Sequence, residues 1–244
     1  MRAPIPLYRA HLRGAQPRLV HFARLAFMTI IFVIMACFAL AYALGYKVDW
    51  SAHRIFQTST ILLSSPRGRV AASIRLDGRI VADHLPARLT YLSPGHYSLS
   101  VEKPGFQVWN RNLNLNPNEA SVHTTIVLMR EPPIAITANS DWLPTTVSPV
   151  DDGLEIRGSE LWVNGTFTTR VSGFLVAAHW YPGGHHVAYQ VNGTIWLLEL
   201  DGLTTQKLLS TSVTEAIPFV FHDNGRSLVY REGQEVKALN LTDH

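Results

Sequence analysis

The chain is poor in cysteine and in charged residues, and each scarcity excludes a class of protein. One cysteine, Cys37, occurs in 244 residues, which excludes an intramolecular disulfide framework and a zinc site built from several cysteines. Charged residues make up only 16% of the chain, whereas a soluble domain usually has about a quarter. The hydrophobic content of 47% is too high for a disordered chain.

Acidic residues are absent from the first 46 positions, and this explains the positive net charge. Residues 1–46 contain five arginines and no acid, so they carry +5, and residues 47–244 carry the remaining −2 of the overall +3. The basic character therefore belongs to a local tail, which excludes a chain-wide nucleic-acid-binding surface.

A run of 22 residues without charge, 25–46, follows this tail. As a helix it is about 33 Å long, which spans a hydrocarbon core of about 30 Å. Arg24 and Leu25 mark the entry of this predicted transmembrane helix. Tyr42, Tyr46 and Trp50 stand where an aromatic belt is expected at the exit. The sequence thus predicts the lipid bilayer as a partner.

The distribution of arginine predicts the orientation of the span. Because the tail 1–24 carries all five arginines, the positive-inside rule places it in the cytoplasm and residues 47–244 outside. A cleaved signal peptide is the competing interpretation, since small residues near the end of the run resemble a cleavage site. We favour an uncleaved anchor in the cell membrane, because secretory apolar regions are only about 7–15 residues long.

A short connector is expected at 47–58, and beyond it period-2 patterns predict a mainly β protein. In 72–76, apolar and polar residues alternate before the turn Asp77-Gly78, and the same alternation recurs in 96–102 and 112–116. Short strands at this spacing, punctuated by turns, are typical of a small β-sandwich. The predicted sandwich covers residues 59–130.

The turns of this region carry a family resemblance. They include Ile74-Arg75-Leu76-Asp77-Gly78, Leu85-Pro86, Leu92-Ser93-Pro94-Gly95-His96-Tyr97 and Val101-Glu102-Lys103-Pro104-Gly105-Phe106. This series resembles the PEGA domain. The resemblance implies a small surface-exposed β-sandwich of the bacterial or archaeal envelope, and it carries no catalytic residues.

Glu131-Pro132-Pro133 predicts a stiff linker, and a repeat follows it in residues 131–244. The string 179–189 (HWYPGGHHVAY) is similar to 221–230 (FHDNGRSLVY) at an offset of 41 residues, which is the spacing of propeller blades. The repeat resembles WD-like propellers of periplasmic Tol-system proteins. The length suffices for two to three blade-like sheets, so we expect an open, truncated or partner-completed stack whose free edges favour self-association.

Catalytic, metal-binding and cofactor-binding motifs are not recognised in the chain. It has no nucleophile elbow, zinc-protease helix, phosphate loop or dinucleotide fingerprint. His185 and His186 are adjacent in a turn and lack a correctly spaced partner ligand. We therefore expect a protein that is not an enzyme and that has no metal or cofactor.

Two groups of residues are the candidate ligand-binding residues. Trp109, Trp180 and Tyr181 have rings suited to stacking on sugars, although aromatic residues in such strands also fill cores. Arg67 and Arg69 belong to a basic stretch that is suited to anionic envelope polymers or headgroups. The sequence thus favours a binding or scaffold protein that contacts cell-wall polysaccharide or another envelope protein. A structural subunit without a ligand is the alternative, and an extracytoplasmic enzyme is third.

Overall fold

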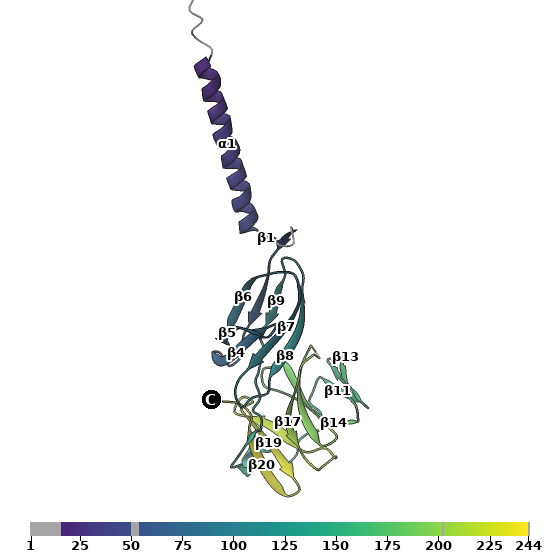
Figure 1. Ribbon diagram of the computed structural model, residues 1–244. Coiled ribbons are helices and arrows are strands. Elements are labelled where there is room, and N and C mark those ends of the chain that lie inside the picture. The colour runs from purple at the N-terminus through teal and green to yellow at the C-terminus, as the bar shows by residue number, and fades with distance from the viewer. Residues whose placement is uncertain (1–15, 50–53, 202, 244) are drawn as a thin grey trace, which may run out of the picture. The chain divides into compact units, whose positions relative to one another are not determined.

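The computed structural model describes residues 16–49, 54–201 and 203–243. The protein is mainly β, with 51% of residues in strands and 12% in helices. It divides into two compact units, residues 1–58 and 59–244, and Figure 1 shows their elements.

The first unit contains the long helix α1 (Gln16–Ala43). Within it, His21–Ala43 has a mean hydropathy of 2.5 and buries none of its surface against the rest of the chain. By length and composition this helix can cross a membrane, as an anchor or as a signal sequence. It extends further in the N-terminal direction than the predicted span, and it includes Arg24 and Leu25.

The helix ends before the predicted exit of the span, at a glycine. Gly45 adopts a φ of +80°, which terminates a helix without steric cost. Tyr42 is therefore helical, whereas Tyr46 begins the hairpin of β1 (Tyr46–Asp49) and β2 (Arg54–Gln57). The connector predicted at 47–58 thus contains paired strands, and Trp50 lies outside the described residues.

The second unit begins with a two-sheet sandwich. Its larger sheet has the order β5-β4-β7-β8, and its smaller sheet the order β6-β3-β9, in which β3 and β9 are parallel. The strands are β3 (Ser59–Leu63), β4 (Val70–Leu76), β5 (Arg79–Leu85), β6 (Ala87–Leu92), β7 (Gly95–Glu102), β8 (Trp109–Leu115) and β9 (Ala120–His123).

Alternation along these strands builds the core of the sandwich. In β8, every second residue from Trp109 to Leu115 is buried and the intervening asparagines are exposed, the pattern of a strand with one face in a core. Asp77 and Gly78 have φ values of 51° and 78°. Both values are positive, as a type I′ turn requires, and they give the β4–β5 hairpin its tight connection.

Residues 134–240 form three further sheets, each mostly from strands that are consecutive in sequence. Their orders are β11-β12-β13, β14-β15-β16-β17 and β10-β20-β19-β18. The strands are β10 (Ile134–Ile136), β11 (Leu154–Arg157), β12 (Glu160–Val163), β13 (Thr166–Arg170), β14 (Leu175–Trp180), β15 (His186–Val191), β16 (Thr194–Glu199), β17 (Thr205–Ser210), β18 (Phe219–His222), β19 (Ser227–Glu232) and β20 (Glu235–Asn240), with a 3₁₀ turn η1 (Ser140–Trp142).

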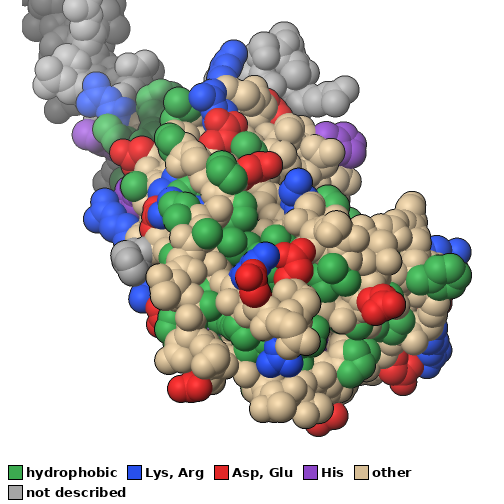
Figure 2. All heavy atoms as spheres, turned by 90° about the horizontal axis from the view of Figure 1, so that it is seen from below, with side chains coloured by type: hydrophobic (Ala, Val, Ile, Leu, Met, Phe, Trp, Pro, Cys, Tyr) green, Lys and Arg blue, Asp and Glu red, His purple; other side chains and the backbone are tan. Residues whose placement is uncertain are grey.

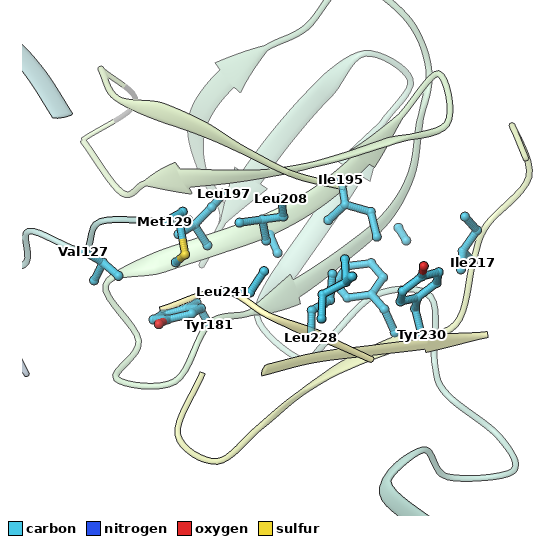
Figure 3. Packing of buried hydrophobic residues seen from close by; sticks show 14 residues of the cluster. Val127, Met129, Tyr181, Ile195, Leu197, Leu208, Ile217, Leu228, Tyr230 and Leu241 are labelled. Carbon is cyan, nitrogen blue, oxygen red and sulfur yellow. The ribbon is translucent and has the colours of Figure 1, made fainter. Parts of the chain in front are cut away.

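The middle of these sheets is apolar on both faces, which stacks the three together. In β15, Val187 and Tyr189 pack against residues of the first sheet, while Ala188 packs toward the third. Figure 3 shows the second of these cores, with Ile195 and Leu208 on one side and Leu228 and Tyr230 on the other. A strand with both faces buried has no polar alternation, and all six residues of β15 are buried.

The first and last strands of this region pair with each other. Ile134 of β10 is opposite Asn240 of β20 in an antiparallel ladder. The third sheet is therefore completed by a strand that precedes the other two sheets in sequence, which ties the beginning of the region to its end.

The segment 126–130, just before the predicted linker, joins two cores. Ile126 and Leu128 are buried in the sandwich, whereas Val127 and Met129 are buried in the core between the second and third sheets. The backbone N–H of Arg130 then donates to the Leu241 carbonyl (2.7 Å). The chain is fixed here because its alternate side chains enter different cores.

Candidate functional site

A cleft of about 360 Å³ lies where the sandwich meets the C-terminal sheets. We call it the junction cleft. Residues of β4 and of the loops around 65–71 and 103–106 line it on the sandwich side, and residues 223–226 and 242–243 line it on the other. Its charged lining residues are Arg67, Arg69, Lys103, Arg226, Asp223 and Asp243.

Arg67 is held at the cleft by neutral acceptors from the C-terminal sheets. Its Nη2 donates to the Tyr181 hydroxyl (2.6 Å) and, at 3.4 Å, to the Asn224 carbonyl. Tyr181 is buried and its own hydroxyl donates to the Gly225 carbonyl (3.1 Å). The structure thus brings together Arg67 and Tyr181, which are two of the residues that the sequence analysis singled out, although they are 114 positions apart.

A tight turn orients Tyr181. Gly225 has a φ of +80°, and a Cβ built on it would lie 2.5 Å from Cζ of the Tyr181 ring. Only glycine satisfies both the backbone conformation and this close approach. The ring therefore rests directly on the backbone of the β18–β19 loop, with Arg67 on its hydroxyl.

Arg69 lies at the exposed rim of the same cleft. Its charge helps to lower the pKa of Asp83, although a hydrogen bond from His84 is the main cause of that shift. Among the described residues, no carboxylate lies within ion-pair distance of the guanidinium of Arg67 or Arg69. On the face drawn in Figure 2, basic and acidic side chains are interspersed with hydrophobic ones. Neither sign of charge therefore dominates this face as a whole.

Asp243 lines the cleft and is shared by two cations. Its carboxylate pairs with Lys103 and with Arg130, and these two cations stack on the Phe106 ring at 4.5 and 5.2 Å. The hydrogen bond from Lys103, with the charge of Arg130, lowers the pKa of Asp243. One carboxylate is therefore shared between two cations from the sandwich side.

A second polar cluster, which we call the junction ion cluster, holds the sandwich to β16. Arg111 of β8 is 8% exposed and donates to Glu199 (2.8 Å) and to Thr204 (2.9 Å), and it also pairs with Asp201. Glu199 accepts further hydrogen bonds from Trp109 (3.2 Å) and Thr125 (2.7 Å). These donors fix the orientation of the buried Glu199 carboxylate.

Two histidines border this cluster. Burial and the neighbouring Arg111 lower the pKa of His123, and burial, with a smaller effect of His185, lowers that of His186. Both side chains are therefore neutral at pH 7. His179 forms a hydrogen bond with Asp151 (3.0 Å) and His222 stacks on Trp142 (4.4 Å), so these two histidines have separate partners.

The other aromatic candidates lie away from the cleft. Trp109 is 1% exposed and fills the sandwich core, so its ring offers no face to a sugar; the alternative role as a core residue is the one the structure shows. Trp180 is half-buried against the first C-terminal sheet and donates to the Asp152 carbonyl (3.0 Å). Neither tryptophan contributes to the junction cleft.

Sequence reasoning missed Lys103, Arg226 and Asp243 as cleft residues. Each lies in a turn or at the chain end, and no local pattern marks it. The repeat gave a partial indication of the site, because Tyr181 lies in the first of the two similar strings (179–189) and Gly225 in the second (221–230).

Comparison with known proteins identifies one part of the chain. The family model described as the PEGA domain matches residues 60–132, which are the sandwich with the segment that joins it to the C-terminal sheets. A search of curated proteins finds no match to the chain. The chain therefore contains a PEGA domain, which confirms the resemblance seen in its turns.

Proposed function

We propose that this protein is a single-pass, membrane-anchored protein of the bacterial cell envelope that holds its PEGA domain and C-terminal sheets outside the cytoplasm for binding. The apolar helix α1 supplies the anchor and the arginine-rich tail sets the orientation. The role is recognition of cell-wall polysaccharide or of another envelope protein, without catalysis.

The junction cleft is the observation that carries this proposal. It is built from both parts of the second unit, so it exists only when the PEGA domain and the sheets are joined. Ligand sites are preferentially concave and lie between packed domains, and the volume of about 360 Å³ is in the lower part of the range of about 300–1,000 Å³ for small-molecule sites.

The C-terminal region is, in this proposal, a short propeller-like stack. Two observations support it: three antiparallel sheets follow one another along the chain, and β10 completes the sheet of β18–β20. Closure by the first strand is a means by which repeated sheets protect their edges.

Docking of partners through sheet edges is the alternative, and self-association would be one form of it. The outer strand β13, with Phe167 exposed beside Trp162, favours it. The edge of β17 disfavours it, because the Gln107 side chain bonds to both backbone groups of Lys207. Cross-linking in intact membranes separates the two hypotheses: multimers that disappear with Phe167→Lys support the edge hypothesis, and monomer alone contradicts it.

Labelling of single cysteines tests the anchor and its orientation. In a Cys37→Ala background, Asn114→Cys places a thiol at an exposed position of β8, and Gln16→Cys places one at the start of α1. A membrane-impermeant maleimide should label Asn114→Cys in intact cells and Gln16→Cys only after lysis. The reverse pattern, or a soluble shortened chain, would overturn the proposal.

Retention on cell-wall polysaccharide tests the binding role. The full chain in detergent micelles should be retained, and Ala71→Trp should abolish retention because Ala71 is exposed and lines the cleft. Ala120→Trp is the matched control, because Ala120 is exposed on β9 and lies outside the cleft lining. Equal retention of both variants would remove the cleft from the proposal.

A further inference from the structure

We propose that the junction cleft is an anion-binding site, in which Arg67 and Arg69 hold the carboxylate or phosphate group of a small polar ligand. This inference rests on the proposed function, since it names the class of ligand that the cleft takes. A charged sugar unit of an envelope polysaccharide fits this chemistry.

The orientation of Arg67 is the first argument. Its Nη2 donates two hydrogen bonds, and both acceptors are neutral oxygens, the Tyr181 hydroxyl and the Asn224 carbonyl. The guanidinium is therefore fixed without being neutralised. Arginine presents five N–H donors. Nη2 already uses both of its own, so Nε and Nη1 keep three N–H groups for single charge-assisted hydrogen bonds to an oxyanion.

The state of Tyr181 supports this conclusion. Burial raises the pKa of its hydroxyl above the ordinary value of 10. The phenol consequently remains protonated at neutral pH and brings no negative charge to Arg67. Its proton is directed to the Gly225 carbonyl, which leaves the hydroxyl oxygen as the acceptor for the guanidinium.

The balance of charge in the cleft is the third argument. Four basic side chains line it against two acidic ones, Asp223 and Asp243. Asp243 is already paired with Lys103 and Arg130, and Asp223 with Arg226 (3.4 Å). The two acids of the lining therefore have partners of their own, and neither pairs with Arg67 or Arg69. Asp83, which the charge of Arg69 influences, does not line the cleft.

The walls of the cleft set the size and character of the ligand. Pro66, Val70 and Phe106 form at least partly exposed apolar surface beside the arginines. A ligand that places its anion on Arg67 can rest a small body on this surface. An envelope sugar that carries a phosphate or a carboxylate matches both requirements, and a free phosphate ion matches only the first.

Calorimetric titration of the full chain in detergent micelles tests the inference. The probes are inorganic phosphate, glucose 1-phosphate, glucuronate and, as the neutral control, glucose. We expect the two charged sugars to bind, phosphate to bind more weakly and glucose not to bind. Affinity should decrease as salt is raised, because the attraction is partly Coulombic. Equal binding of glucose and glucose 1-phosphate would overturn the inference without any variant.

Substitutions locate the site. The double variant Arg67→Gln, Arg69→Gln should weaken binding of glucose 1-phosphate by on the order of ten- to a hundredfold, which is the effect of losing one or two charge-assisted hydrogen bonds. Arg88→Gln is the matched control, because Arg88 is exposed on the same sandwich and does not line the cleft. Arg67→Lys should be intermediate, because lysine keeps the charge and loses the fork. Equal effects of Arg88→Gln and the double variant would overturn the assignment.

The two proposals fail in different ways. If Ala71→Trp abolishes retention on polysaccharide but the arginine variants leave it unchanged, the cleft binds and the inference of an anionic group is wrong. If Ala71→Trp has no effect while the arginine variants still abolish binding of glucose 1-phosphate, the anion site exists and the proposed polysaccharide role is wrong.

Discussion

At the scale of single residues, the geometry of the cleft depends on contacts that are too close to admit a larger side chain. Tyr181 lies between Arg67 and the backbone of Gly225, so one ring links a PEGA-domain arginine to the β18–β19 loop. The close approach at Gly225 requires the absence of a side chain. The conformation of this loop and the position of the arginine are therefore coupled.

Gly225→Ala should show this coupling. The added Cβ would lie 2.5–2.7 Å from Tyr181 atoms, so we expect a cost of about 1–3 kcal/mol for overpacking, added to about 1–2 kcal/mol for the left-handed backbone. Gly233→Ala is the matched control, because Gly233 has a φ of +64° but no atom within 4 Å of its built Cβ. Urea denaturation measures both variants, and equal destabilisation would contradict the contact.

Protonation of the junction histidines should make stability depend on pH. The pKa values of His123 and His186 are lowered from the ordinary 6.5, so below pH 6.5 the unfolded chain binds protons that the folded chain does not. The free energy of unfolding should therefore be greatest above pH 6.5 and fall as the pH decreases toward 5. Denaturation curves between pH 5 and 8 measure this trend.

Replacement of His123 measures its contribution to the pH dependence of the free energy of unfolding. His123→Gln should flatten the pH dependence, whereas His96→Gln, at an exposed position of β7, should leave it unchanged. A wild-type chain that becomes more stable on acidification through this range would contradict the prediction, because the sign follows from the direction of both shifts.

At the scale of elements, glutamine side chains form hydrogen bonds with backbone groups that no neighbouring strand pairs. The Gln206 amide accepts from the N–H of Met129 (3.0 Å) and donates to the Val127 carbonyl (2.7 Å). In the same way, the Gln190 amide accepts from the N–H of Ile217 (2.9 Å) and donates to the Glu215 carbonyl (2.7 Å). Each amide imitates one step of a β-ladder, which satisfies backbone groups beside segments that are not strands.

Gln206→Leu should reveal what this pairing contributes. It leaves a buried N–H and a buried carbonyl without these partners, at about 1–3 kcal/mol for each group. Gln107→Leu is the control: it makes the same change at Lys207, which is exposed, so water replaces the lost bonds and the cost should stay below about 1 kcal/mol. Thermal unfolding of both variants measures the difference, and a larger effect at Gln107 would contradict it.

The elements that the sequence predicted are those with local causes. Alternation located the strands around Leu76, Leu99 and Leu113, and the turn chemistry of Asp77-Gly78 located the hairpin between β4 and β5. The apolar run located α1, although Gly45 ends the helix before Tyr46. These elements depend on residues that are neighbours in sequence, so one sequence is enough to predict them.

The remaining elements depend on partners distant in sequence. The residues from Ile126 to Met129 are all apolar, and the sequence does not show that alternate side chains enter the sandwich core and the C-terminal core. The double proline after Glu131 marks an extended segment, and nothing in it reveals that β10 pairs with β20. The cleft likewise joins residues 67 and 181, whose proximity is a property of the folded chain alone.

At the scale of the whole molecule, buried contacts join the PEGA domain and the C-terminal sheets within one compact unit. The junction ion cluster is buried between β8 and β16, and the segment from Ile126 to Met129 belongs to the cores on both sides. Removing one member of such a cluster leaves an uncompensated buried charge, which costs about 3–5 kcal/mol. The PEGA domain and the C-terminal sheets should therefore unfold together.

Leu99→Ala tests this cooperativity from inside the PEGA domain. Leu99 is completely buried in the sandwich, so its truncation should cost about 2–5 kcal/mol. If the second unit unfolds as one, hydrogen exchange should accelerate both in β7, which contains Leu99, and in β15. The residues of β15 do not belong to the hydrophobic core that contains Leu99. Ile55→Ala, at an exposed position of β2, should change neither. Acceleration confined to the sandwich would show that the two parts open independently, and the junction cleft would then be a contact between separable domains.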